Sequence, residues 1–174
     1  FYPRPLLGYS GRRLMVTEIN IQDVEPIFSV VVPAFNAQNF IGATLDSLVK
    51  QQFPFFEIIV VDDGSTDGTK GVVDKFSFDR RIRYVRQDNE GTGGALNTGH
   101  AISRGKYLTW CSADNIYFPQ FLATFFNVFQ QLEAQNVPVE YIYADFIYVN
   151  NQGQQIGIVQ HPDAQPKKDL VNGY

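Results

Sequence analysis

The chain reads EIIVVDDGSTDGT between Glu57 and Thr69. Its first five residues are mostly β-branched and apolar, which predicts a buried strand. The strand ends abruptly in Asp62 and Asp63, and the glycine and serine that follow are typical of a turn. Asp67 is then expected to cap a helix. This strand, turn and helix form the unit from which the rest of the fold is inferred.

The same alternation of strand and helix recurs along the chain. Strands are predicted at residues 28–32, 57–61, 82–85, 106–111 and 139–145, followed by a hairpin at residues 146–159. Helical patterns separate the first four strands and return between the fourth and the fifth. The class predicted is therefore α/β, with a mostly parallel, Rossmann-like sheet flanked by helices. Ligands of such sheets bind outside the carboxyl ends of the strands.

Composition limits the classes of protein to which the chain can belong. Its 174 residues are 44% hydrophobic, and we divide them into a linker or N-terminal extension (1–26) and one domain (27–174). The net charge of −4 offers no basic stripe for nucleic acid. A single cysteine, Cys111, excludes an internal disulfide framework and is typical of a reducing compartment. No apolar run is long enough for a membrane span, and the absence of an initial methionine indicates a piece of a longer protein.

Unusual residues follow four of the predicted strands. They are Pro33-Ala34-Phe35-Asn36, Asp62-Asp63, Asn89-Glu90-Gly91 and Ser112-Ala113-Asp114-Asn115. Each group taken alone is explained by turn formation or helix capping. Their joint occurrence along one edge of a parallel sheet predicts a single cleft lined by an aromatic ring, carboxylates and glycine backbone.

These residue types suit a nucleotide diphosphate. Phe35 can stack on a nucleobase, a contact worth about 1–3 kcal/mol, and Asp63 can accept a hydrogen bond from a base N–H or a ribose hydroxyl. Gly91 lets backbone amides approach a ligand closely. Asp114 can hold a divalent cation whose remaining oxygen ligands come from the diphosphate and water. An acidic chain can bind an anionic nucleotide in this way.

The sequence resembles the nucleotide-sugar-binding half of inverting glycosyltransferases of family 2, which have the GT-A fold. Four motifs carry the resemblance, in order and at matching spacing over residues 27–150: VVVPAFN from Val30, VVDDGSTD from Val60, NEGTGGALNTG from Asn89 and GKYLTWCSADN from Gly105. The resemblance implies the donor-binding part of a GT-A domain that is incomplete at its C-terminus. It also implies an enzyme of polysaccharide or cell-envelope glycan biosynthesis.

The resemblance implies a role for particular residues. Phe35 would stack on the uracil of a UDP-sugar, Asp63 would contact the same base, and Asp114 would ligate manganese or magnesium. Ser112 stands where the family's aspartate-x-aspartate motif has its first acid, and Leu96 stands where many relatives carry arginine. The full set of nucleotide-binding residues implied in this way is Pro33, Ala34, Phe35, Asn36, Asp62, Asp63, Gly91, Asn97 and Ala113.

The implied reaction is transfer of a sugar from a nucleotide-diphosphate sugar, with a UDP-sugar favoured, to an acceptor hydroxyl with inversion. A divalent metal would stabilise the leaving diphosphate. A carboxylate general base would activate the acceptor, and we expect it beyond Tyr174, with Asp145 and Asp163 as less favoured alternatives. Without that base the isolated chain is expected to be inactive. The acceptor, whether glycan, lipid-linked or protein, is not specified, and the expected location is the cytoplasm or the cytoplasmic face of a membrane.

Three other interpretations stay open at this point. A degenerate module of the same fold would bind nucleotide without catalysis, which Ser112 and the missing base would explain. A flavodoxin-like phospho-acceptor domain also has paired acids at a strand end, although here the pair follows the second strand. A dinucleotide-binding Rossmann domain would explain Gly91 and Gly93, but Leu96 fills its third glycine position. A P-loop is excluded, because no glycine loop continues into Gly-Lys-Ser/Thr.

Overall fold

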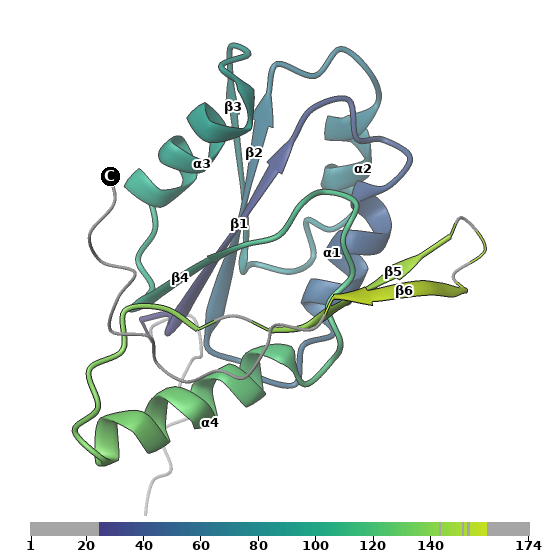
Figure 1. Cartoon of the computed structure of the whole chain (residues 1–174). Helices are drawn as coiled ribbons and strands as arrows, with labels where there is room; N and C mark the ends of the chain where they lie inside the picture. The colour runs from purple at the N-terminus through teal and green to yellow at the C-terminus, as the bar shows by residue number, and fades with distance from the viewer. Residues whose placement is uncertain (1–24, 143, 151, 153, 160–174) are drawn as a thin grey trace, which may run out of the picture. The chain divides into compact units, whose positions relative to one another are not determined.

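The computed structural model describes residues 25–142, 144–150, 152 and 154–159, so almost all of the predicted extension (1–26) lies outside the described residues. The chain divides between Ala123 and Thr124 into two compact units. The first unit contains a four-stranded sheet, all parallel, in the order β3-β2-β1-β4 (Figure 1). The predicted parallel α/β sheet is therefore confirmed.

The bounds of the elements follow the predicted pattern closely. The sheet is made of β1 (Phe28–Ala34), β2 (Phe56–Asp63), β3 (Ile82–Gln87) and β4 (Tyr107–Trp110), with helices α1 (Ile41–Val49), α2 (Thr69–Asp74) and α3 (Gly91–Ala101) between them. Helix α4 (Phe121–Ala134) crosses the boundary between the units, and the second unit holds the antiparallel hairpin β5 (Phe146–Val149) and β6 (Gln155–Val159). Over the described ranges, no helix is both long and apolar enough to cross a bilayer.

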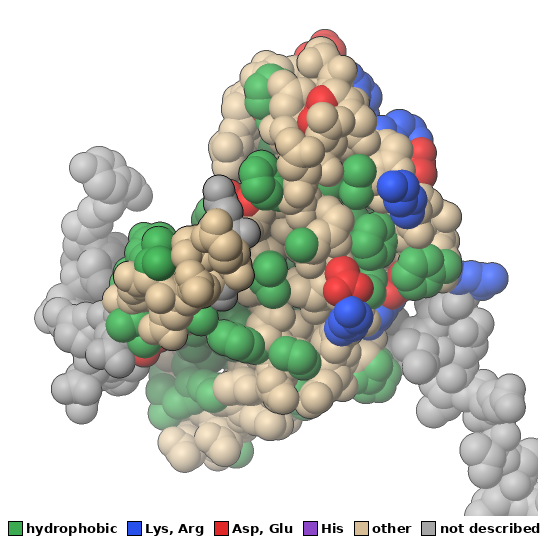
Figure 2. Space-filling view, turned by 90° about the vertical axis from the view of Figure 1, so that its right-hand side faces the viewer, with side chains coloured by type: hydrophobic (Ala, Val, Ile, Leu, Met, Phe, Trp, Pro, Cys, Tyr) green, Lys and Arg blue, Asp and Glu red, His purple; other side chains and the backbone are tan. Residues whose placement is uncertain are grey.

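The central strands are buried because helices cover both faces of the sheet. Val31, Ile59 and Val61 pack with Ala95 of α3 on one face. The alternate residues of the same strands point to the opposite face, where Figure 1 shows α1 and α2. Figure 2 shows the outer side of this second layer, where charged side chains are scattered among apolar ones. The carboxyl ends of the strands thus emerge from a fully packed core.

Strand β1 continues two residues beyond the predicted end, through Pro33 to Ala34. Proline is normally kept out of central strands because it has no N–H to donate. The carbonyl oxygen of Val31 accepts the N–H of Cys111 at 2.8 Å, so the odd-numbered residues of β1 direct their backbone groups toward β4. The ladder to β4 ends where Val31 pairs with Trp110. The missing N–H of Pro33 therefore interrupts no ladder bond.

The strand order decides between the folds that the sequence left open. Flavodoxin-like sheets have the order 2-1-3-4-5, which the observed order excludes. Rossmann sheets begin 3-2-1-4, but their glycine-rich turn follows the first strand, whereas Gly91 here follows β3. The order reverses between β1 and β4, and ligands of open α/β sheets bind at such a switch point.

The strand predicted at residues 139–145 is wrong. The described residues of this stretch form neither a strand nor a helix. Apolar alternation yields a strand only where a neighbouring strand completes its hydrogen bonds, and the ladders of the described residues do not include this stretch. Asp145 therefore does not end a strand of the main sheet. It precedes β5 in the second unit.

The amino end of the sheet is held by a buried carboxylate, that of Glu57. It accepts hydrogen bonds from Ser29 Oγ at 2.8 Å, from Arg83 Nη1 at 3.0 Å and from the backbone N–H of Arg104 at 2.7 Å. Both arginines also form ion pairs with it. Burial alone raises the pKa of Glu57, but these hydrogen bonds outweigh burial, so its pKa lies below the ordinary value. This network joins β1, β2, β3 and the turn that precedes β4.

Helix α3 packs so closely on the sheet that Gly99 has no room for a side chain. A Cβ atom at Gly99 would lie 2.3 Å from Cγ1 of Val31, whereas a Cβ atom at Gly93 would meet no atom within 4 Å. We expect Gly99→Ala to lower the free energy of unfolding by about 1–3 kcal/mol through overpacking. Gly93→Ala is expected to raise it by about 0.5 kcal/mol, because alanine loses less backbone entropy. Urea denaturation checks both, and equal effects would contradict the packing argument.

Candidate nucleotide site at the strand ends

Strand register brings several of the predicted residues together at the carboxyl end of the sheet. Ala34 of β1 pairs with Asp62 of β2, and Asp62 pairs with Arg86 of β3. One residue further on, Asp63 pairs with Gln87. The ends of these three strands therefore form one continuous edge.

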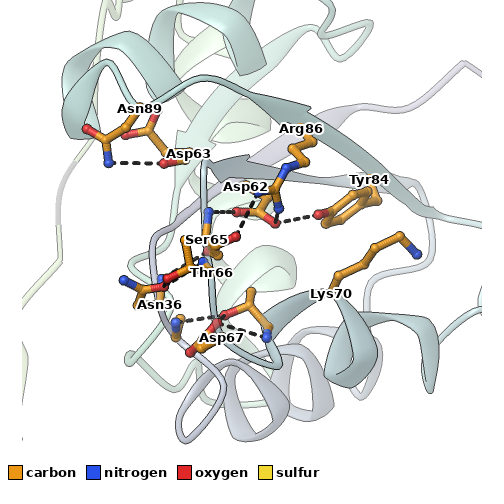
Figure 3. Close-up of polar contacts among 12 residues, drawn as sticks. Asn36, Asp62, Asp63, Ser65, Thr66, Asp67, Lys70, Tyr84, Arg86 and Asn89 are labelled. Carbon is orange, nitrogen blue, oxygen red and sulfur yellow. Dashed lines mark hydrogen bonds and ion pairs between the residues drawn. The ribbon is translucent and has the colours of Figure 1, made fainter.

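Asp62 is fully buried and holds the turn after β2 together. Its carboxylate accepts hydrogen bonds from the backbone N–H of Ser65 at 2.8 Å, from Nη1 of Arg86 at 3.0 Å and from the hydroxyl of Tyr84 (Figure 3). Burial alone raises the pKa of Asp62, but these hydrogen bonds and the Arg86 charge outweigh burial and lower it. Burial and the Asp62 carboxylate raise the pKa of Tyr84 to about 12. Asp62 thus directs its carboxylate to groups of the protein itself.

Asp63 is better placed than Asp62 to meet a ligand. Its Oδ1 accepts hydrogen bonds from Nε2 of Gln87 at 2.8 Å and from the backbone N–H of Glu90 at 2.9 Å. Within the described part of the chain, no hydrogen bond reaches its Oδ2. Because a carboxylate only accepts, these two donors hold one oxygen and leave the other without a donor, at a residue that is only 3% exposed. Sequence reasoning missed Gln87, whose role depends on the register of β3 against β2.

A mesh of hydrogen bonds joins the loop after β1 to the turn after β2. Asn36, whose φ of 49° lies in the left-handed region, accepts the N–H of Thr66 at 2.9 Å through its Oδ1. Asp67 accepts the N–H of Thr69, the first residue of α2, at 3.0 Å and that of Gln38 at 3.1 Å. The predicted helix cap is off by one residue, because the N-cap of α2 is Gly68, which has no side chain to cap with. Asp67, one residue earlier, still accepts the N–H of Thr69 and also binds the other loop. The side chain of Asn36 holds these loops together.

Phe35 lies within this fixed loop and keeps its ring open to solvent. Its side chain is 54% exposed, although Ala34 before it and Ala37 after it are buried. Pro33 and Ala34 lie within β1 and are buried, so they support the loop from below rather than presenting side chains to solvent. Because hydrogen bonds already hold the backbone of this loop, a ligand that stacks on the ring need not order that backbone, which lowers the entropic cost of binding.

Helix α3 begins at the same edge of the sheet. Its first residue, Gly91, has a φ of 79°, a left-handed conformation that glycine adopts without strain. The N–H groups of a first helical turn favour an anionic group nearby. Asn97 is exposed on the same helix but lies about 9 Å further along its axis at 1.5 Å per residue. Gly91 and Asn97 are therefore placed at different distances from the strand ends.

The loop after β4 carries Asp114 on the other side of the switch point. Cys111 and Ala113 are buried, whereas Asp114 is exposed. Burial raises the pKa of the Cys111 thiol to about 12, so this thiol stays protonated at neutral pH. The carbonyl oxygen of Ala113 accepts a hydrogen bond from Thr44 Oγ1 of α1 at 2.8 Å. Asp114 is thus the anionic side chain of a loop that is fixed to α1.

Asp114 supplies the oxygen chemistry that magnesium or manganese prefers. Across residues 25–142 and the described residues that follow, no three His, Cys, Asp or Glu side chains gather into a ready-made cage. Mg²⁺ is commonly held by one or two protein carboxylates, with phosphate oxygens and water completing the shell. The residues present therefore fit a cation that is bound together with a phosphate-bearing ligand. Of the two less favoured base candidates, Asp145 lies in the second unit and Asp163 lies outside the described residues.

Comparison with known sequences finds transferases. Residues 29–170 match the sequence model of glycosyl transferase family 2. The glycosyltransferase GlyA of Streptococcus pneumoniae is 34% identical over 112 residues, which are 64% of this chain and 16% of that protein. An uncharacterized glycosyltransferase of Rickettsia prowazekii is 31% identical over 147 residues, which are 84% of this chain and 44% of that protein. The chain thus spans less than half the length of these relatives.

Comparison with solved structures finds the same kind of protein. S. aureus TarS in complex with UDP-GlcNAc matches with a TM-score of 0.59 and 30% identity, over 61% of this chain and 32% of that one. The mannosyltransferase PcManGT from Pyrobaculum calidifontis, in complex with GDP-Man and Mn²⁺, matches with a TM-score of 0.53 and 29% identity, over 58% of this chain and 31% of that one.

Proposed function

Because this chain belongs to glycosyl transferase family 2 and has the GT-A fold, we propose that it binds a nucleotide-diphosphate sugar across the strand ends. One observation carries the proposal: the buried carboxylate of Asp63 is held through one oxygen, and no donor among the described residues reaches the other. A nucleobase has N–H groups at its edge and two flat faces. An open acceptor and the exposed ring of Phe35 suit these two features.

In the proposed complex each part of the nucleotide meets a different element. Phe35 stacks on the base, Asp63 accepts from a base N–H, and the start of α3 at Gly91 faces the diphosphate. Asp114 ligates a divalent metal, manganese or magnesium, which neutralises charge on the leaving diphosphate when bound. Asn36 and the other residues of the mesh hold the loops in place.

We favour a UDP-sugar as the donor. Uracil presents a single N–H between two carbonyl oxygens, which suits the single open oxygen of Asp63. Guanine presents two adjacent donors and so calls for two acceptors. The complex of S. aureus TarS with UDP-GlcNAc supports a uridine nucleotide, and the complex of PcManGT with GDP-Man makes a guanosine nucleotide the first alternative.

The proposed reaction moves the sugar to an acceptor hydroxyl with inversion. The hydroxyl oxygen bonds to the anomeric carbon while the bond from that carbon to the diphosphate oxygen breaks. The hydroxyl proton passes to a carboxylate base, and the diphosphate leaves with the electron pair. We place this base beyond Tyr174, since the chain spans less than half the length of the relatives it matches.

Titration of the chain with UDP, with and without manganese, tests the proposal. We expect manganese to tighten UDP binding by about tenfold, because Asp114 would hold the cation and the cation would offset part of the negative charge of the diphosphate. Asp114→Ala is expected to abolish this gain and to leave metal-free binding unchanged. The matched control is Asp74→Ala, which removes an exposed carboxylate from α2. Isothermal titration calorimetry measures all three proteins.

The other outcomes of this titration are equally informative. Binding of GDP in preference to UDP would overturn the uridine assignment and keep the nucleotide site. An equal gain from manganese in the Asp114→Ala variant would overturn the metal assignment. A folded chain that binds neither UDP nor GDP would contradict the proposed function altogether.

A further inference from the structure

Helix α1 carries a row of buried polar side chains. Thr44, Ser47 and Gln51 lie three and four residues apart, the spacing of neighbours on one helical face, with Gln51 just beyond the last residue of α1. Their exposed fractions are 0%, 8% and 7%. Burial of polar groups is costly unless each one finds a hydrogen-bond partner. The partners of this row therefore show what α1 is built to hold.

The row binds the backbone of the loop that follows β4. Thr44 Oγ1 donates to the carbonyl oxygen of Ala113 at 2.8 Å, and Ser47 Oγ accepts the N–H of Tyr117 at 3.1 Å. The same two side chains thus hold this loop on both sides of Asp114. Residues 112–119 form neither helix nor strand, so their backbone groups lack the partners that such elements supply. The side chains of Thr44 and Ser47 take the place of those partners.

Gln51 extends this arrangement to the start of α4. Its Nε2 donates to the carbonyl oxygen of Phe118 at 2.8 Å, and its Oε1 accepts the N–H of Leu122 at 3.1 Å. The neighbouring Gln52 donates its backbone N–H to the carbonyl oxygen of Pro119 at 2.9 Å. The loop from Ala113 to Pro119 is thus held against α1 and the two glutamines beyond it by four backbone contacts, at Ala113, Tyr117, Phe118 and Pro119.

We propose that this polar row, and Thr44 above all, positions the Asp114 carboxylate for the metal. The inference rests on the proposed function, because it concerns the same nucleotide site. Ala113, whose carbonyl oxygen Thr44 holds, is the residue immediately before Asp114, so movement of that peptide unit moves the carboxylate. Asp114 is the single acid of its motif, and no second carboxylate there compensates for a displaced one. Thr44 acts through Ala113 and is a positioning residue.

Thr44→Val tests this inference, because valine keeps the shape of threonine and removes its hydroxyl. We expect the variant to bind UDP in the presence of manganese about tenfold more weakly than the wild type, in the range found for partners that orient metal ligands. Metal-free UDP binding is expected to stay unchanged, because the substitution does not alter Phe35 or Asp63, the residues proposed to bind the base. Thr44→Ser, which keeps the hydroxyl, is expected to restore the manganese-dependent gain.

Two further measurements separate positioning from general loss of stability. Ser103→Ala removes a hydroxyl that donates to the carbonyl oxygen of Gly99 at 2.9 Å, away from the loop, and it is expected to keep the gain from manganese. Amide hydrogen exchange of residues 113–119 is expected to accelerate in Thr44→Val without nucleotide or metal. Ser47→Ala is expected to show a similar, smaller change.

The outcomes distinguish this inference from the function on which it rests. A wild-type chain without any gain from manganese contradicts the proposed metal role, and this inference with it. A gain from manganese that survives in Thr44→Val overturns the inference alone. Equal weakening of metal-free and metal-dependent binding in Thr44→Val, or failure of Thr44→Ser to restore the gain, would also overturn it, because either result shows a merely structural role.

Discussion

Replacing Asp63 by asparagine is expected to weaken UDP binding by about 30- to 100-fold and to improve binding of CDP relative to UDP. The structure determines how the new amide is oriented. Gln87 and the backbone N–H of Glu90 both donate to Oδ1 of Asp63, so the oxygen of an asparagine must occupy that place. Its NH₂ group then lies where the open Oδ2 now stands, and an acceptor becomes a donor.

The replacement of a hydrogen-bond acceptor by a donor at this one position explains the size and direction of the change in affinity. In the proposed complex uracil offers N3–H to Asp63, and in the variant this group would meet an NH₂ group instead of a carboxylate oxygen. A hydrogen bond to a charged group is worth about 1.5–3 kcal/mol, and about 1.4 kcal/mol corresponds to a tenfold change in affinity. Cytosine has an unprotonated N3, which accepts a hydrogen bond, so CDP suits the variant better than UDP does.

Competitive titration of UDP and CDP against the wild type and Asp63→Asn measures this switch. Asp63→Ala is the informative comparison, because it removes the acceptor without adding a donor and should weaken UDP without favouring CDP. Asp74→Asn, an exposed site on α2, is the control for an unrelated change of charge. Unchanged UDP binding in Asp63→Asn would show that Asp63 does not contact the base.

Replacing Glu57 by alanine is expected to lower the free energy of unfolding by about 3–4 kcal/mol. Removing one partner of a buried ion pair typically costs about 3–5 kcal/mol, because the remaining groups lose their compensation. Here Ser29 and the backbone N–H of Arg104 lose their acceptor. The side chains of Arg83 and Arg104 are 37% and 57% exposed, so water relieves part of the cost.

Urea denaturation of the wild type, Glu57→Ala and Glu57→Gln measures this cost. Glutamine keeps one acceptor oxygen and loses the charge, so its loss of stability should be intermediate. The nucleotide affinity of any folded fraction should be unchanged, because Glu57 lies at the amino end of β2 and Asp63 at its carboxyl end. A loss below about 1 kcal/mol in Glu57→Ala would show that the network is dispensable, since surface ion pairs have that value.

Most of the sheet could be predicted from the sequence because the middle of each central strand, Val30–Val32 and Ile58–Val61, is apolar. These runs have no side that alternates to polar residues, which predicts buried strands between two layers of helix. The stretch at 139–145 has a similar apolar pattern, yet it is not a strand. Each of the other runs has a neighbouring strand to pair with, and the described residues of this stretch have none. A local sequence pattern does not reveal this difference.

The candidate site also contains residues that a local sequence pattern reveals and residues that it does not. The acid pair, Phe35 and the glycines stand out in sequence because they interrupt apolar runs at strand ends. Gln87 does not, since it is an ordinary polar residue until β3 is placed beside β2 and its amide meets Asp63. The roles of Thr44 and Ser47 could likewise not be predicted, because they are ordinary polar residues of an amphipathic helix. The loop that buries them lies about 70 residues further along the chain.

The row of polar contacts on α1 also has a consequence for the order in which the molecule assembles. Its hydrogen bonds join residues 67 to 71 positions apart in sequence. The contacts around the acid pair are more local, with Asn36 to Thr66 spanning 30 positions and Asp63 to Gln87 spanning 24. Distant contacts form later, because closing a longer loop costs more entropy. During synthesis, we expect the polar groups of α1 to stay hydrated until the chain beyond β4 has been made and the loop that follows it can dock.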